Sequence, residues 1–395
     1  MLKNKYLKEW AKIVSYHFPD LSLPEVAGLA TWSFGIVMTG SSSLTRVSEF
    51  IGRLNQENTN AVRQRLKEWY QEADAKTGKK RTAIDVTKCF APLLQWILSM
   101  WNSEEKWLPL AVDSTNIGQH FTVLSVHVLY RGCGIPVAWK IVKGTEKGAW
   151  KPHWQQLFQS LKDVVPPEMQ VVVSADRGLY ADWLFDAICA LNWHPFLRIN
   201  YTGTYQIRGE TEWQFLDKLV QKTGTSWSGI VTCFKTNPLN CTILARWDEG
   251  YKDPWLIVTD LLPQQGDALW YSLRSWIECS YRDIKSDGWQ WHKTRLREPN
   301  RAERVWLAMA VATLWTITIG TDIEPHYLNN LSKELSPNHL DKKQDIPKKT
   351  VCKISCFLQG LIHILADLLN GKAISLTGLF PQPYHSTSAA AANTS

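Results

Sequence analysis

The chain has 395 residues, of which 45% are hydrophobic and 21% are charged, a balance that excludes collagen-like, coiled-coil and largely disordered chains. Lysine and arginine exceed the acids, 44 against 37, which suits a polyanionic partner without requiring one. The eight cysteines contain no C-x-x-C pair, so the sequence indicates neither a zinc ribbon nor a redox motif.

No segment has the pattern of a signal peptide or of a membrane span. Met1–Phe18 carries four lysines among its apolar residues, unlike a secretory leader. The longest apolar run, Val305–Ile319, is shorter than the ~20 residues that a span needs, so we expect a buried helix there. The chain is therefore expected to be cytoplasmic, with no membrane partner.

Residues 1–105 are predicted to be helical. Ser43–Gly52 and Ala61–Tyr70 carry apolar residues at helical spacing, with a polar turn at 55–60 between them. Two short helices around a polar turn are typical of a helix-turn-helix, whose second helix enters a major groove, and equally of a hairpin in a helical bundle. The basic loop Lys76–Arg81 slightly favours the DNA-binding interpretation.

From Trp107 the pattern changes from helical to extended and predicts an α/β fold. Three strands, a helix and then a strand–helix–strand unit predict a mixed sheet with helices on its faces. Together with helices in 263–328, residues 106–200 would form this core. The predicted strands are Leu108–Val112, Phe121–Tyr130, Ile135–Val142, Gln170–Ala175 and Pro195–Ile199, and the helices are Trp150–Val165 and Ala181–Leu191.

The rest of the chain departs from this alternation. Residues 201–262 contain three strand-like runs and are interpreted as a β-rich insertion, after which helices resume at Gly266 and continue to about Gly320. Residues 329–350 are polar and charged and predict a linker. Residues 351–395 predict one amphipathic helix and a disordered tail.

Two aspartates are candidate site residues. Asp113 ends the first predicted strand and Asp176 ends a later one, and the carboxyl ends of strands are where α/β sheets place their sites. Each has an alternative explanation, because Asp in these positions also makes a good turn or helix-cap residue.

A third acid strengthens the case. In a helix over Ala268–Lys285, 100° per residue aligns Tyr271, Arg274, Glu278 and Lys285 on one stripe beside an apolar face. A solvated helix would also carry charge, but it need not align an aromatic, two cations and one acid so narrowly. Three carboxylates from two strands and a helix are what a pair of Mg²⁺ ions requires, because hard cations take oxygen ligands.

The pattern Tyr271-x2-Arg274-x3-Glu278-x6-Lys285 resembles the Tyr-Arg-Glu-Lys signature of bacterial insertion-sequence transposases with a DDE triad. The other matching segments are Asp113-Ser114-Thr115, Asp176-Arg177-Gly178, Pro254–Thr259 and Arg297–Arg301. The resemblance implies an RNase H-like catalytic domain, an insertion between the second Asp and the Glu, and an N-terminal end-recognition domain. It also implies Mg²⁺-dependent cut-and-paste cleavage, often through a hairpin, followed by strand transfer.

The resemblance also implies residue roles and partners. Asp113, Asp176 and Glu278 would ligate two Mg²⁺ ions, for which Mn²⁺ would substitute. The residues implied to hold DNA phosphates are Tyr271, Arg274, Arg282 and Lys285. The partners would be double-stranded DNA, as terminal inverted repeats and target, within the nucleoid, and a second copy of the chain. The C-terminal part is short for the family, so the dimerisation region would be reduced or different.

Trp255 begins the last strand of the predicted insertion, directly after Pro254. In the family that the chain resembles, a Trp beginning the matching strand holds a base that leaves the stack during hairpin formation, and stacking is worth ~1–3 kcal/mol. The competing interpretation is core packing, since tryptophan supplies 21 of the 395 residues.

Two other functions stay open. A structure-selective nuclease on the same fold would hydrolyse DNA without joining it. A regulator derived from a transposase would bind DNA without chemistry, although the presence of all three acids argues against it. A small-molecule enzyme is disfavoured, because the sequence has no G-x-G-x-x-G, Walker, G-x-S-x-G or zinc-ligand spacing.

Overall fold

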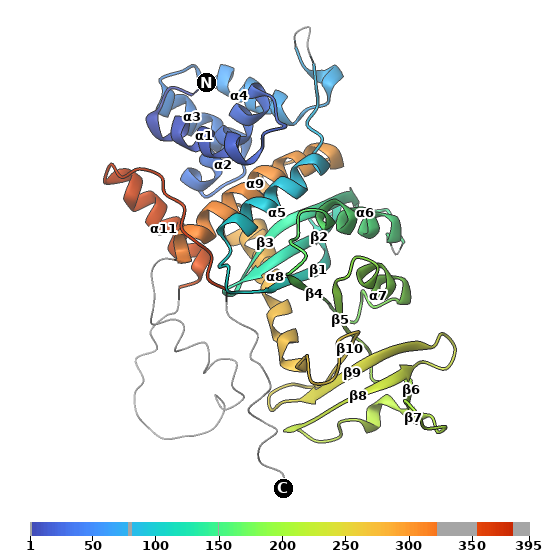
Figure 1. The fold of residues 1–395 in the computed structure, drawn as a ribbon. Coiled ribbons are helices and arrows are strands. Elements are labelled where there is room, and N and C mark those ends of the chain that lie inside the picture. The colour runs from blue at the N-terminus through green and yellow to red at the C-terminus, as the bar shows by residue number, and fades with distance from the viewer. Residues whose placement is uncertain (1, 78–80, 149, 322–353, 382–395) are drawn as a thin grey trace.

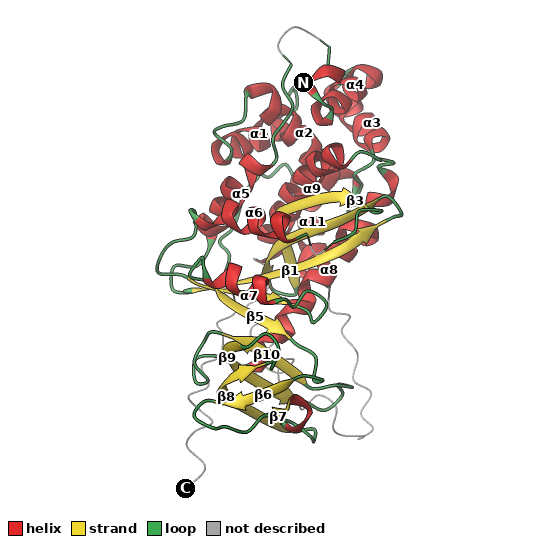
Figure 2. Cartoon of the chain, turned by 90° about the vertical axis from the view of Figure 1, so that its right-hand side faces the viewer, coloured by secondary structure: helices red, strands yellow, loops and turns green. Residues whose placement is uncertain are grey.

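The computed structural model describes residues 2–77, 81–148, 150–321 and 354–381. N-terminal helices cover one end of a long sheet, and the strands of residues 201–262 form its other end (Figure 1). Seen from the side in Figure 2, the sheet continues from the helical part into the strands at the bottom of the view. The predicted mixed α/β architecture, a large mixed sheet with flanking helices, is confirmed.

One sheet of ten strands runs through the described residues. Its strands are β1 (Trp107–Ile117), β2 (Phe121–Tyr130), β3 (Cys133–Lys143), β4 (Gln170–Ala175), β5 (His194–Arg198), β6 (Thr204–Ile207), β7 (Gln214–Phe215), β8 (Thr225–Cys233), β9 (Leu239–Trp247) and β10 (Trp255–Thr259). Their order is β3-β2-β1-β4-β5-β10-β9-β8-β6-β7. β1, β2 and β3 are antiparallel, β4 and β5 follow parallel to β1, and the remaining pairs are antiparallel.

Two local features explain how this sheet is built. β2 and β3 are joined by Arg131 and Gly132, whose φ angles of 44° and 78° give a two-residue turn that matches the twist of the strands. β10 pairs with β5 on one side and with β9 on the other. The strands of residues 201–262 therefore extend the sheet without a break.

The N-terminal part of the structure is helical. Its helices are α1 (Lys5–His17), α2 (Leu23–Thr39), α3 (Leu44–Asn55), α4 (Thr59–Tyr70) and α5 (Thr87–Met100), with a short 3-10 turn η1 (Ala73–Ala75). α3 and α4 are the two helices expected around a polar turn, and the Asn58 side chain caps α4 by accepting from the backbone N–H groups of Asn60 and Ala61.

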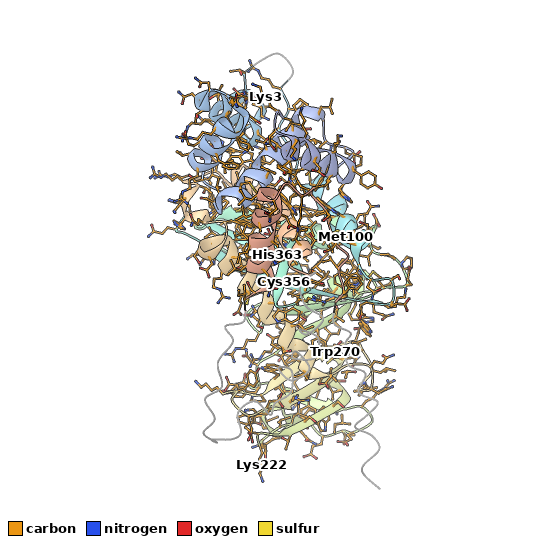
Figure 3. All side chains as sticks on the ribbon, turned by 90° about the vertical axis from the view of Figure 1, so that its left-hand side faces the viewer. Lys3, Met100, Lys222, Trp270, Cys356 and His363 are labelled. Carbon is orange, nitrogen blue, oxygen red and sulfur yellow. The ribbon has the colours of Figure 1, made fainter. Side chains whose placement is uncertain are left out.

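The remaining helices lie between and after the strands in the sequence. They are α6 (Lys151–Lys162), α7 (Asp182–Cys189), α8 (Trp276–Arg282), α9 (Pro299–Gly320) and α11 (Cys356–Leu369), with the short turns η2 (Leu216–Lys218) and η5 (Trp291–Lys293). Figure 3 shows Cys356 and His363 on α11, which packs on α9. The packing is close at Gly360, where a Cβ atom would lie 1.7 Å from the Thr316 carbonyl oxygen.

α9 is the central helix of the molecule. By length and composition it could cross a membrane, but 94% of its most apolar window is buried inside the structure. It contacts α2 on one side and β3 on another, and Trp315 stacks on Trp10 of α1 with ring centroids 4.2 Å apart. The buried helix expected around Val305–Ile319 is thus a core helix. Many tryptophans are used in this way, including Trp10, Trp32, Trp96, Trp139, Trp154, Trp289, Trp306 and Trp315, which are fully buried.

The structure corrects three predicted boundaries. β1 continues past Asp113 to Ile117, because its outer half still pairs with β2. The helix over Ala268–Lys285 is not uniform: it has a 3-10 segment η3 (Ala268–Ser275), then α8, then a π-helical segment η4 (Asp283–Asp287). The last helix begins at Cys356. The predicted linker at 329–350, and the predicted tail from residue 382 onward, lie outside the described residues.

Candidate active site

The sheet register brings the two aspartates together. β1 and β4 are parallel, and Val112 is the partner of Ala175. Asp113 and Asp176 are the next residues on each strand, so they lie side by side where β4 ends. Asp113 is therefore not at the end of its own strand, and its position is set by the end of the neighbouring strand.

Each aspartate divides its two oxygens between two tasks. Oδ1 of Asp113 accepts from the Ser114 N–H at 2.8 Å, and Oδ1 of Asp176 accepts from the Gly178 N–H at 2.9 Å. Oδ2 of each points to Arg274, at 3.0 Å for Asp113 and 3.7 Å for Asp176. The turn-forming role considered for these residues is thus real, and it leaves one oxygen of each directed into the site.

Glu278 completes the group from α8. Its carboxylate accepts a hydrogen bond from the Arg274 guanidinium one turn earlier, so one arginine contacts all three acids. The side chain of Arg274 is only 11% exposed, whereas that of Glu278 is 60% exposed. The three carboxylates predicted from sequence therefore surround a single guanidinium.

The electrostatics of this group are unbalanced. Burial raises the pKa of Asp113 to about 6; Arg274 opposes this rise, and the negative charges of Asp176 and Glu278 add to it. Three carboxylates around one guanidinium leave an excess of negative charge. Asp113 is the most buried of the three acids, so water solvates its charge least.

The donor set fits a hard divalent cation. Carboxylate oxygens are the ligands that Mg²⁺ prefers, and the excess negative charge would be neutralised by such an ion. Among the described residues no three His, Cys, Asp or Glu side chains stand at metal-ligand spacing. The point on which the three acids converge holds the Arg274 guanidinium instead, so a bound ion would require this side chain to turn away.

A buried network that the sequence analysis missed connects α8 to β1. The Tyr281 hydroxyl donates to the Asp113 carbonyl oxygen at 3.0 Å and lies 2.7 Å from Ser125 Oγ. Ser125 Oγ is in turn 2.9 Å from Nε2 of the fully buried His127. With Tyr271 at zero on the 100° wheel, Tyr281 lies at about 280°, next to Arg274. This position could have identified it from the sequence as a residue of the site. Tyr281 holds the helix of Glu278 against the strand of Asp113.

The remaining signature cations lie in different surroundings. Lys285 donates to Thr115 Oγ1 at 2.6 Å, two residues beyond Asp113 on β1, and burial lowers its pKa. Arg282 is exposed and pairs with Asp287 at 3.4 Å, away from the three acids. Lys285 is therefore close to the site, and Arg282 faces solvent.

The two aromatic candidates are buried and touch each other. Trp255 is 7% exposed, and its ring meets that of Tyr271 edge to face at 5.4 Å. The Arg198 guanidinium lies over the Tyr271 ring, 5.8 Å from its centroid. Figure 3 shows the neighbouring Trp270 between the helical part and the lower strands. In this structure the Trp255 and Tyr271 side chains pack against each other and are buried.

Comparisons with known proteins give the family. The family model described as "Transposase DDE domain" matches residues 76–315, which is more than half of the chain and includes all three acids. No curated protein matches the chain.

Two solved structures were compared with the fold. The cryo-EM structure of the piggyBac transposase synaptic complex with hairpin DNA is 11% identical, covers 87% of this chain and 85% of its own, and has a TM-score of 0.28. The crystal structure of human ENDOV is 15% identical, covers 57% of this chain and 95% of its own, and has a TM-score of 0.23. The chain belongs to the Transposase DDE domain family, whose members are enzymes that act on DNA.

Proposed function

We propose that this chain is a cut-and-paste DNA transposase. It would cleave double-stranded DNA at the terminal inverted repeats of its element, in a Mg²⁺-dependent reaction that passes through a hairpin, and join the ends to target DNA. The observation that carries the proposal is the convergence of Asp113, Asp176 and Glu278 on one buried guanidinium, from two neighbouring strands and a helix.

The three carboxylates would hold Mg²⁺, which supplies Lewis-acid activation and charge neutralisation for phosphoryl transfer when bound. Arg274 contacts all three acids and is the nearest guanidinium to them, so on turning away it would meet a DNA phosphate beside the cut. Lys285, anchored at Thr115, would hold a phosphate on the other side of Asp113. Arg274 and Lys285 would thus bind the DNA backbone and position it next to the three acids.

The acids can be tested by conservative amide substitution. Asp113→Asn, Asp176→Asn and Glu278→Gln should each abolish cleavage of a supercoiled plasmid that carries the flanking repeats, while end binding stays close to wild type. Asp163→Asn and Glu168→Gln change exposed acids elsewhere and are the matched controls. Wild-type cleavage by any one of the three site variants would remove that residue from the proposed triad.

A strand-transfer assay separates the transposase from the other two functions. A pre-cut repeat end with a free 3′-hydroxyl, mixed with target plasmid, should give joined products that need all three acids. Cleavage without joining would indicate a structure-selective nuclease, and end binding without cleavage would indicate a DNA-binding regulator. Light scattering with and without repeat DNA tests the proposed homodimer, for which the complex should contain two chains.

Trp255 belongs to the same proposal through the hairpin step. A base-holding Trp255 would leave folding and first-strand nicking of Trp255→Ala near normal and impair hairpin formation most strongly on intact duplex ends. A packing role, which its burial against Tyr271 favours, would lower the melting temperature and all activities together. Trp270→Ala, a change to a neighbouring tryptophan on η3, is the control for general loss of packing.

A further inference from the structure

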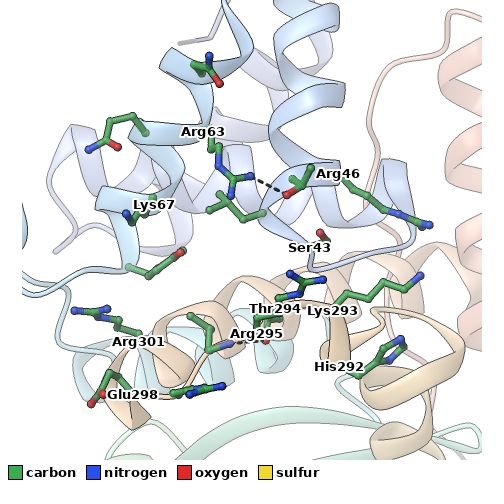
Figure 4. A pocket seen from close by; sticks show the side chains of 17 residues that line it. Ser43, Arg46, Arg63, Lys67, His292, Lys293, Thr294, Arg295, Glu298 and Arg301 are labelled. Atoms are coloured by element: carbon green, nitrogen blue, oxygen red, sulfur yellow. Dashed lines mark hydrogen bonds between the residues drawn. The ribbon is translucent and has the colours of Figure 1, made fainter.

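A large basic groove lies between the N-terminal helices and the segment that precedes α9. Its volume is about 1150 Å³. Figure 4 shows Arg46, Arg63 and Lys67 on the helical side, and His292, Lys293, Arg295 and Arg301 on the opposite side. We call this cavity, between α3–α4 and residues 292–301, the α3/α4 groove.

The charge of the groove is strongly one-sided. Seven lysine and arginine side chains line it against one acid, Glu298. Within the part of the chain that the structure describes, none of the seven forms an ion pair. Their polar contacts are with neutral groups: Arg46 donates to Gln290 at 3.3 Å and Arg63 to Thr45 at 2.7 Å. Nε of Arg301 is buried without a hydrogen-bond partner. Neutral groups thus hold Arg46 and Arg63, and their charges stay available to an anion.

The groove leads to the three acids. A second cavity of about 500 Å³ shares Arg295 and Arg297 with it and is also lined by Lys285. Lys285 donates a hydrogen bond to Thr115, which is two residue steps from Asp113 along β1; at roughly 3.4 Å per step this is about 7 Å. A line of positive charge thus runs from α4 to the strand that carries the first acid.

The lining also indicates the kind of polymer that fits. Sites for single-stranded nucleic acid use exposed aromatic rings on which bases stack. The aromatic side chains that line the α3/α4 groove are Tyr70, which is buried, and His292, whose Nδ1 lies 3.2 Å from the Lys285 carbonyl oxygen; Leu44 and Leu296 are half-buried. A surface of seven cations with a single exposed ring matches the phosphates of a duplex, which carry one negative charge per about 1.7 Å of axis, better than a row of stacked bases.

We propose that the α3/α4 groove holds the phosphate backbone of double-stranded DNA and directs it, through Arg295, Arg297 and Lys285, to the acids of the same chain. This inference rests on the proposed function and deepens it. It assigns DNA contacts to Arg46, Arg63 and Lys67, to which the signature motif assigns nothing.

The test is the salt dependence of DNA binding, measured without metal so that no cleavage occurs. Fluorescence anisotropy with a labelled duplex would compare wild type with the double variant Arg63→Gln/Lys67→Gln. Each lost phosphate contact should flatten the slope of log K against log salt by about 0.9, so the double variant should lose about 1.8. Arg295→Gln/Arg297→Gln should lose a similar amount.

The matched control is Arg208→Gln/Lys222→Gln, which removes the same number of charges from exposed positions in the connections between the strands of residues 201–262, where Figure 3 shows Lys222. This variant should keep the wild-type slope. Wild-type slopes in the groove variants, or an equal loss in the control, would overturn the inference. So would a loss confined to single-stranded DNA or to an acidic polypeptide. Thermal melting of each variant, expected to be unchanged, checks that the variants fold.

The outcome is separable from that of the proposed function. Asp113→Asn should bind duplex with the wild-type slope, because it removes no phosphate contact. If wild type fails to cleave but the groove variants lose salt dependence, the proposed activity is wrong and the groove assignment stands. If wild type cleaves and the groove variants bind as wild type does, only the groove assignment is wrong.

Discussion

Lowering the pH is expected to destabilise the fold through one buried side chain, His127. The ring is fully buried, and burial lowers its pKa from 6.5 to about 3, while Ser125 Oγ holds Nε2 at 2.9 Å. The His127 ring therefore binds a proton below pH 6.5 in the unfolded chain, but only below about pH 3 in the folded chain. The stability due to the neutral ring is complete above pH 6.5 and is lost as the pH falls from there.

The size of the effect follows from the pKa difference. At about pH 5 the pH lies roughly 1.5 units below the pKa of the histidine in the unfolded chain. At about 1.36 kcal/mol per unit, proton binding to the unfolded chain lowers the free energy of unfolding by about 2 kcal/mol. His17, whose pKa burial lowers to about 4, contributes in the same direction. The contribution of His127 is therefore the difference between wild type and a His127 variant, and the pH slope of wild type alone would overstate it.

Urea unfolding followed by tryptophan fluorescence at about pH 7.5 and about pH 5 measures this difference. Wild type should lose about 2 kcal/mol more than His127→Gln between the two pH values. His292→Gln, at an exposed ring, should keep the wild-type pH dependence. An identical pH dependence in wild type and His127→Gln would refute the reasoning, because the proton would then not be excluded by folding.

Three further predictions concern other contacts. Arg304→Met should lower the unfolding free energy by about 3 kcal/mol in urea, because it breaks a bidentate pair with Glu72 at 2.8 and 2.9 Å and leaves the carbonyl oxygens of Tyr70 and Ile84 without their donor; an unchanged free energy would show that these contacts do not stabilise the fold. Gly360→Ala should release α11 from α9, since its Cβ would clash with the Thr316 carbonyl, and limited proteolysis should then remove the C-terminal helix first. Arg274→Gln leaves the three acids without a cation, so Mg²⁺ should raise its melting temperature more than that of wild type, and an equal shift would contradict competition at this point.

Local pattern determined much of the fold. The strands predicted at Phe121–Tyr130 and Gln170–Ala175 have those bounds in the structure, because each is a run of apolar and β-branched residues closed by turn residues. Helical spacing likewise identified the core-facing side of α8, where Ile277 and Ser280 are buried. The three candidate acids were also named from sequence, since strand ends and a helical stripe can be recognised from residue type and spacing alone.

Tertiary contacts decided the geometry of the site. Pairing of Val112 with Ala175 sets Asp113 beside Asp176, and no property of either segment alone fixes that register. The segment 268–287 contains 3-10, α and π turns where one helix was predicted, and its Tyr281 and Lys285 are bonded to β1. Helical periodicity indicates which face is buried but not what lies against it.

The same reason explains why the α3/α4 groove was not predicted. The basic residues of 61–70 and those of 292–301 lie more than two hundred residues apart in the sequence, and net charge alone allows many arrangements. Packing of the N-terminal helices on α9 brings the two sets face to face. Residue spacing thus indicated the candidate acids, and the family was recognised by resemblance, whereas the path by which DNA would reach those acids depends on contacts between distant segments.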